Sequence, residues 1–119
     1  MSEIRTYDLV VVGGGAAGLA AALTAYENGI TFGIMTDHPV LPLEFSRTQL
    51  AIFVAHGLPY LEGLRSITIN AAKTVGIDNQ VGSIEVGKDA DIVIYDGDPL
   101  HYMTKVKTVL VRGNIAYTE

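Results

Sequence analysis

The sequence of 119 residues contains 13 acidic and 8 basic side chains, for a formal net charge of −5, and 49% of its residues are hydrophobic. This balance fits a globular protein with a hydrophobic core and excludes a nucleic-acid-binding class, because scattered Lys and Arg cannot neutralise a phosphate backbone. The absence of Cys excludes disulfides, thiolate zinc sites and cysteine nucleophiles. The apolar run 9–23 is rich in Gly and too short to span a membrane, so we expect a cytoplasmic protein with no membrane partner.

A strand, a helix and a second strand are expected at the start of the chain. Residues 7–12 form a short run rich in Val, typical of a buried strand, which three glycines end. Residues 16–28 carry apolar side chains at helical spacing and are followed by Gly29, a suitable residue to end a helix. Residues 30–35 are apolar and of strand length. This order favours two parallel strands with a right-handed crossover.

The remaining elements complete an expected α/β fold. Helices are predicted at 45–56 and from Pro59 to Val75, although β-branched residues in the second of these disfavour helix. Strands are predicted at 84–86, 91–95, 106–112 and 115–118, with a tight turn at Gly113–Asn114. We therefore expect one compact domain over residues 1–119. It combines a short, mostly parallel sheet, which includes the strand at 91–95, with packed helices and a C-terminal β-hairpin.

A glycine-rich motif lies between the first strand and the first helix. Gly13, Gly15 and Gly18 satisfy the GxGxxG pattern in the strand-to-helix context that dinucleotide binding requires. Gly13 permits a tight turn, Gly15 lets the backbone approach a pyrophosphate, and Gly18 lets helix and strand pack closely. Free N–H groups at the helix start, near Ala16, would face the phosphates. Asp37 is 19 positions beyond Gly18 and is a candidate ligand of the ribose.

Residues 7–22, YDLVVVGGGAAGLAAA, resemble the N-terminal fingerprint of FAD-dependent oxidoreductases of the fumarate reductase type. The resemblance implies binding of FAD or an ADP-like nucleotide. In that pattern the ribose-binding acid usually stands one place earlier, where this chain has Thr36. The alternative is a glycine turn that serves packing alone.

From about residue 27 onward the chain resembles the amidohydrolase superfamily, in particular its imidazolonepropionase-like branch. The resemblance rests on GITFGIMTDHPV at 29–40, TINAAK at 68–73, GSIEVGKDADIV at 82–93, DPL at 98–100 and the closing residues 109–117. It implies that residues 29–40 hold the last strand of a catalytic barrel and that Asp37 helps to bind a metal and takes a proton from the attacking water. His38 would lie in the adjoining loop.

Most of the metal ligands that this resemblance implies are missing from the sequence. The family's His-x-His pair, its bridging lysine or carboxylate and two further histidines lie on earlier strands. Catalytic zinc requires three protein ligands. This chain offers Asp37 and His38, with His56 expected at a helix end and His101 in an exposed turn. The zinc site is therefore incomplete, and Asp37 has an alternative interpretation as the cap of a turn.

Because the two resemblances meet near residues 24–28, the sequence suggests a recombined, designed or truncated chain with no self-sufficient catalysis. A small FAD- or ADP-binding module is one alternative. A metal-dependent amidohydrolase acting on C–N bonds, completed by other chains, is another. Neither parent's sheet is complete, so we expect a homo-oligomer formed through exposed sheet edges. The sequence does not identify a substrate.

Overall fold

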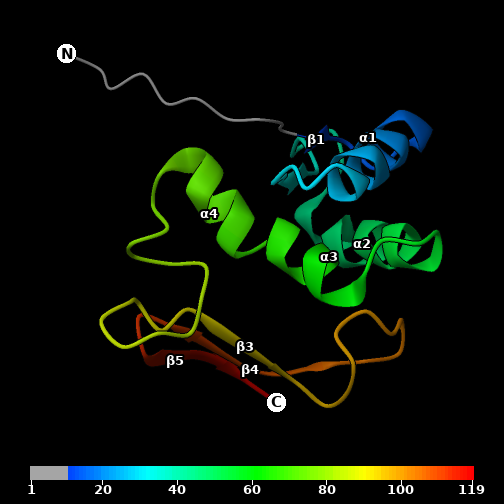
Figure 1. The fold of residues 1–119 in the computed structure, drawn as a ribbon. Helices are drawn as coiled ribbons and strands as arrows, with labels where there is room; N and C mark the ends of the chain where they lie inside the picture. Colours follow the sequence, from blue (N-terminus) through cyan, green and yellow to red (C-terminus); the bar gives the residue numbers. More distant parts are fainter. Residues whose placement is uncertain (1–10) are drawn as a thin grey trace.

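The computed structural model describes residues 11–119, so residues 7–10 of the first predicted strand lie outside the described part. β1 (Val11–Val12) and β2 (Ile34–Met35) pair in parallel, and α1 (Ala16–Glu27) connects them (Figure 1). The predicted strand–helix–strand order at the start of the chain is therefore correct, although β2 occupies only the end of its predicted range. Gly29, with a positive φ of 68°, follows the helix end and allows the chain to reverse toward β2.

The middle of the chain is helical. A short 3₁₀ turn, η1 (Leu43–Phe45), leads into α2 (Ser46–Ala55), and α3 (Tyr60–Ser66) and α4 (Ile69–Val75) follow. The single helix expected from Pro59 to Val75 is wrong, because the chain breaks between α3 and α4. Thr68 has φ −123° and ψ −101° there, and such β-branched residues have a low helix propensity.

The hydrophobic core lies between α1, the two short strands and α2. Leu50 and Phe53 of α2 are fully buried, and Leu58, after the helix, is 1% exposed. They pack with residues of the N-terminal unit, listed as Val11, Ala22, Ala25, Phe32 and Ile34. Burial of these side chains is the main force that holds the helices against β1 and β2.

The C-terminal strands form a separate antiparallel sheet. β3 (Ile92–Tyr95), β4 (Val106–Val111) and β5 (Asn114–Thr118) are hydrogen-bonded in that order. The predicted C-terminal hairpin is confirmed, with Arg112 and Gly113 both at positive φ in its turn, as the twist of a two-residue hairpin favours.

The predicted mostly parallel sheet is wrong. β3, the strand expected to join β1 and β2, pairs antiparallel with β4 instead. The ten residues between them make a compact loop that returns β4 alongside β3, and antiparallel neighbours need only such a short connection. The strand expected at 84–86 is also absent from the described residues, since that segment is irregular.

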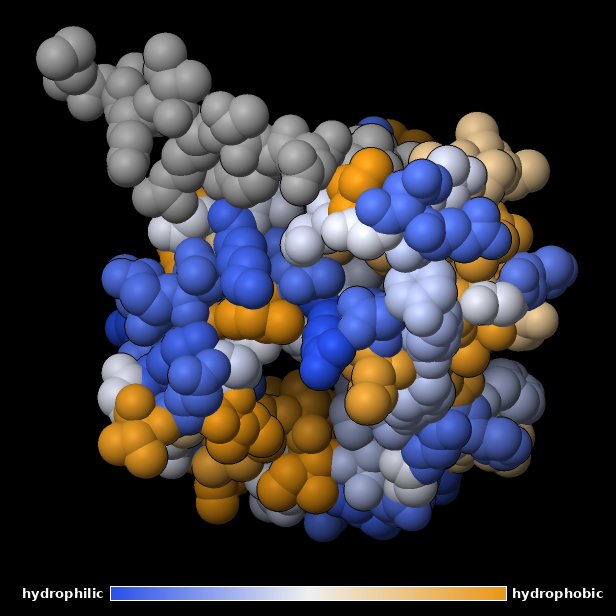
Figure 2. Space-filling model, in the orientation of Figure 1, coloured by the Kyte–Doolittle hydropathy of each residue, from blue (hydrophilic) through white to orange (hydrophobic). Residues whose placement is uncertain are grey.

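The helices lie on one side of this antiparallel sheet, and β5 is at its outer edge (Figure 1). The segment between α4 and β3 crosses from the helical part to the sheet. Hydrophobic residues gather on this face over that segment and around a hollow (Figure 2). Within residues 11–119, no helix has the length and apolar character needed to cross a membrane.

Candidate functional site

Asp37 lies directly after β2, at the carboxyl end of that strand. The preceding residue, Thr36, is buried, whereas Asp37 is exposed. Asp37 has a positive φ of 54°, a left-handed conformation that Asp adopts more readily than most residues. Its carbonyl accepts a hydrogen bond from the Val40 N–H at 2.8 Å. The backbone of a short turn thus directs the carboxylate away from the core, and no described residue donates a hydrogen bond to it.

The glycine motif lies at the same sheet edge as Asp37. β1 and β2 are parallel with Val12 opposite Met35, so their carboxyl ends meet. The Gly13 N–H donates to the Met35 carbonyl at 2.8 Å. The structure thus brings the start of the Gly13–Gly18 loop beside the segment that carries Asp37, as both interpretations of the sequence require.

One glycine of the motif is required by packing. A Cβ at Gly18 would lie 2.5 Å from the Gly13 carbonyl oxygen, whereas one at Gly14, between the motif glycines, would meet the Gln49 side chain, with Nε2 at 2.3 Å. Gly18 therefore allows the close helix–strand approach that was predicted. Gly15 caps α1, and a Cβ there would meet no atom within 4 Å.

Gln49 is a buried polar residue of α2, within the helix predicted at 45–56. It is 8% exposed, and its Oε1 has no hydrogen-bond partner among the described residues. Its side chain covers the Gly14 side of the loop. A Gln at a helical position carries no local signal of this role, so the contact could be found only from the fold.

The candidate metal ligands are not brought together. His38 is exposed beside Asp37. His56 caps the C-terminal end of α2, with Nδ1 2.8 Å from the Ile52 carbonyl, and the Met103 N–H donates to Nδ1 of His101 in a distant exposed loop. No three His, Asp or Glu side chains are grouped for a metal ion within residues 11–119. These residues alone therefore do not fit a catalytic zinc centre.

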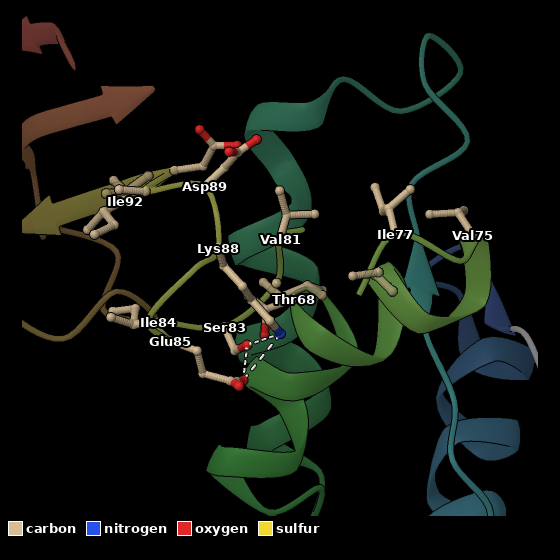
Figure 3. Close-up of a pocket in the computed structure, with 17 residues that line it drawn as sticks. Thr68, Val75, Ile77, Val81, Ser83, Ile84, Glu85, Lys88, Asp89 and Ile92 are labelled. Carbon is tan, nitrogen blue, oxygen red and sulfur yellow. Dashed lines mark hydrogen bonds and ion pairs between the residues drawn. The ribbon is translucent and has the colours of Figure 1, made fainter. Parts of the chain in front are cut away.

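A cavity lies away from Asp37, between α4 and the segment that leads to β3 (Figure 3). Its volume is about 590 Å³. Val75, Ile77 and Ile84 contribute apolar surface, and Lys88 closes one end by donating to Ser83 Oγ at 2.6 Å and Glu85 Oε1 at 3.2 Å. The Ser83 hydroxyl and the Lys88 ammonium lower the pKa of the Glu85 carboxyl.

The cavity is lined mainly by apolar side chains, with the Lys88–Glu85 ion pair at its edge. Lys88 and Glu85 bind one another, Asp89 and Asp91 contact Arg112 outside the cavity, and the lining contains neither Asp37 nor any histidine. Sequence reasoning did not predict it, because its walls come from α4 and from an irregular segment that carries no periodic pattern. It is an apolar contact surface more than a centre for acid–base chemistry.

Comparison with known families identifies the class of protein. A model of the amidohydrolase family matches residues 14–118, and the chain belongs to this family. The match begins inside the glycine motif and runs across residues 24–28. The proposed junction and the flavoprotein-derived start therefore find no support in these comparisons.

Individual relatives agree with this assignment. The chain is 37% identical to a 5-methylthioadenosine/S-adenosylhomocysteine deaminase of Thermoanaerobacter pseudethanolicus, over 84% of this chain and 29% of the relative. It is 34% identical to an imidazolonepropionase of Alkaliphilus oremlandii, over 81% and 25% respectively. The crystal structure of an amidohydrolase from Thermotoga maritima superimposes with a TM-score of 0.80 and 34% identity, over 85% of this chain and 26% of that one.

The chain thus spans between a quarter and a third of the length of these relatives. The imidazolonepropionase-like resemblance is confirmed at the level of the family.

Proposed function

We propose that this chain provides the Asp37-bearing portion of an amidohydrolase that hydrolyses a C–N bond, and that residues 11–119 are not catalytically sufficient by themselves. The observation that carries the proposal is the position of Asp37. Its side chain is exposed at the carboxyl end of a parallel strand, which is where the chemistry of α/β barrels and open α/β sheets takes place.

The role proposed for Asp37 is that of a general base. A carboxylate can accept the proton of an attacking water if it is held in place and not already paired. Both conditions fit the turn after β2, where the backbone is fixed by the bond between Asp37 and Val40. The reaction class is supported by the relatives, one of which is named as a deaminase.

The resemblance also implies a metal ion, which would activate the water as a Lewis acid. Asp37 and His38 are suitable ligand types, but the described residues supply no third ligand nearby. We therefore assign Asp37 no step that passes through a metal. The remaining ligands would come from residues outside this chain, such as those of the unmatched part of its relatives.

Complementation tests the proposal. The part of the Alkaliphilus oremlandii imidazolonepropionase that this chain does not match would be expressed as a separate polypeptide and mixed with this chain, with zinc present. Turnover of that enzyme's own substrate would be followed by absorbance. We expect activity with the wild-type chain and a loss of about 10²–10⁴-fold with Asp37→Asn.

The matched control is Asp78→Asn, which makes the same chemical change in a turn after α4. We expect it to retain full activity. A mixture that is inactive with the wild-type chain, or equally active with Asp37→Asn and Asp78→Asn, would contradict the proposed function.

A nucleotide-binding module is the second candidate, favoured by the open space around Gly15 at the start of α1. It requires that ADP or FAD raise the melting temperature, with stabilisation of about 2.7 kcal/mol at a hundredfold excess over the dissociation constant. Gly15→Val should abolish the shift and still fold, since a Cβ there would meet no atom within 4 Å, although Val is a poorer helix cap than Gly and should lower the unliganded melting temperature somewhat. If neither nucleotide raises the melting temperature of the wild type, this candidate function is excluded.

A further inference from the structure

A further cavity lies at the opposite end of β2 from Asp37. Its walls come from the end of α1, the segment 29–32, and residues of α3 and α4, and its volume is about 360 Å³. Because residues 29–32 precede β2 and Asp37 follows it, the cavity lies near the amino end of the strand. Its size is within the range of cavities that bind small molecules, so the chemistry of its lining selects the ligand.

Two cationic side chains line this cavity from neighbouring helices. Arg65 lies in the last turn of α3 and Lys73 in the last turn of α4. Arg65 donates through Nη1 to Glu62, which also lines the cavity, and this leaves other guanidinium N–H groups for a ligand. Among residues 11–119, Lys73 has no carboxylate within ion-pair distance. Two cations against one carboxylate give the lining a net positive charge.

Asn70 adds a polar group that burial holds in place. It lines the cavity and is only 8% exposed, and it precedes Lys73 by three residues, so both side chains share one face of α4. Within residues 11–119 its main-chain carbonyl accepts a hydrogen bond from Thr74 Oγ1 at 3.0 Å, whereas its side-chain amide has no partner. The amide atoms are not enclosed, since the enclosed and unpaired side-chain atom of the described residues is Gln49 Oε1. The amide therefore opens into the cavity, where its NH₂ group can donate to a ligand.

A phosphate monoester matches this set of donors. A guanidinium, an ammonium and an amide NH₂ all donate to oxygen, and the bonds from the two cations are strengthened when the acceptor is an anion. The three terminal oxygens of a phosphate monoester can each accept from a different group, whereas a carboxylate offers two. Phe32 and Ile69 add apolar wall surface, which suits the carbon skeleton of an ester better than free phosphate.

We propose that the cavity between α1, α3 and α4 binds a small phosphate monoester, such as a sugar phosphate, and that Lys73, Arg65 and Asn70 hold its phosphate group. Glu62 competes with this phosphate for the Arg65 guanidinium and so limits the affinity. The site shares no residue with the turn that carries Asp37 or with the Gly13–Gly18 loop. The proposal therefore does not depend on the proposed function.

Nuclear magnetic resonance titration of the intact, ¹⁵N-labelled chain with ribose 5-phosphate, at low ionic strength, tests the proposal. We expect saturable binding that shifts the resonance of the Asn70 side-chain amide. Lys73→Met should weaken binding by about tenfold or more, because it removes a charge-assisted hydrogen bond. Asn70→Asp should do the same, because it replaces the donor by a carboxylate of similar size. Glu62→Gln should instead tighten binding about threefold, since it releases Arg65 from a surface ion pair.

Matched controls make the same charge changes in the C-terminal part of the chain. Lys105→Met is the control for Lys73→Met, and Glu119→Gln, which breaks the exposed ion pair with Lys107, is the control for Glu62→Gln. Both controls should leave the dissociation constant within about twofold, because exposed charges far from the ligand are largely screened. Circular dichroism of each variant establishes that it is folded, and the surface variants of Lys73 and Glu62 test the proposal even if Asn70→Asp does not fold.

Four results would overturn the proposal. The first is a wild type that shows no saturable binding up to about 20 mM ribose 5-phosphate. The second is binding that Lys73→Met weakens no more than Lys105→Met does. The third is loss of binding in Gly15→Val but not in Lys73→Met, which would place the phosphate at the start of α1. The fourth is inorganic phosphate that binds as tightly as ribose 5-phosphate, which would exclude a site for a monoester.

Discussion

Replacement of Arg47 by alanine should weaken the attachment of the C-terminal sheet to the helices. Arg47 lies in the first turn of α2, and its Nε donates to the Pro99 carbonyl at 2.6 Å. Its Nη2 donates to the carbonyls of Thr104 at 3.2 Å and His101 at 3.4 Å. The guanidinium also lies 4.8 Å from the centre of the Tyr95 ring. One side chain thus holds the connection between β3 and β4 against α2.

The size of the effect follows from these contacts. A hydrogen bond from a charged donor contributes about 1.5–3 kcal/mol, and the short, half-buried bond to Pro99 is of this kind. The two longer bonds share one nitrogen and contribute less. A cation–π contact adds about 0.5–1 kcal/mol at a partly exposed site. Since these terms overlap, we expect Arg47→Ala to lower the free energy of unfolding by about 2–3 kcal/mol.

Denaturant unfolding followed by circular dichroism measures this difference. Arg65→Ala is the matched control, because among residues 11–119 the Arg65 side chain forms only a surface ion pair with Glu62, which is worth well under ~1 kcal/mol. Arg47→Lys should restore less than half of the loss, since an ammonium cannot donate in the planar pattern of a guanidinium. If Arg47→Ala and Arg65→Ala differ by less than about 0.5 kcal/mol, the reasoning is refuted, because that gap is within the normal scatter of surface substitutions.

Three further substitutions test other features. Gly63→Ala should destabilise by about 1–2 kcal/mol despite its better helix propensity, because the added Cβ would lie 2.9 Å from Cδ1 of fully buried Leu50; an equal or higher melting temperature would contradict this. The Leu100 amide and the Tyr60 hydroxyl lower the pKa of Asp98, so its contribution to stability is present above the unfolded-state pKa and is lost as the pH falls through the folded-state value. The melting temperatures of wild type and Asp98→Ala should therefore converge between pH 7 and pH 2, and a constant difference would count against this bond. Gly113→Ala should cost about 1 kcal/mol, because φ is 76° there, and calorimetry that finds no change would exclude the strained turn.

The elements that the sequence predicted well are those fixed by local residues. The strand, the glycine loop, α1 and Gly29 follow one another within twenty residues, and each has a pattern that selects its conformation. The C-terminal hairpin is likewise set by a short turn between two β-branched segments. The end of α4 follows from Gly76, whose φ of 76° suits a helix terminus.

The pairing of β3 could not be predicted in the same way. Its residues IVIY show only that the strand is apolar on both faces, which is typical of a buried parallel strand. The choice of β4 as its neighbour depends on the loop that returns the chain, whose bonds to Arg47 come from α2, some fifty residues away in sequence. Such long-range contacts leave no periodic pattern in the sequence from which strand pairing could be predicted.

Of the candidate site, the sequence predicted only the part that depends on one strand, which is the position of Asp37. The apolar run at 30–35 predicts a strand just before Asp37, and the structure has β2 there, although its Met35 is exposed. The cover that Gln49 provides over Gly14 was missed, because a lone Gln in a helix does not indicate burial. The missing metal ligands could be noticed only through resemblance to longer proteins.

The hydrophobic core is unevenly distributed along the chain, so we expect local unfolding to begin in the part that contributes least to it. Every buried hydrophobic residue of the described chain lies between Val11 and Ala72, whereas β3, β4 and β5 are held by their own ladder, by Arg47, by the Tyr60–Asp98 bond and by Leu100, which packs against the core. Cooperative units with few buried apolar contacts open at lower free energy than the global transition. Amide exchange should therefore be fastest in the sheet and slowest in α1 and α2. We expect the C-terminal sheet to be the least stable unit of the described residues, so under brief protease treatment it should be cleaved first and leave the helical part intact.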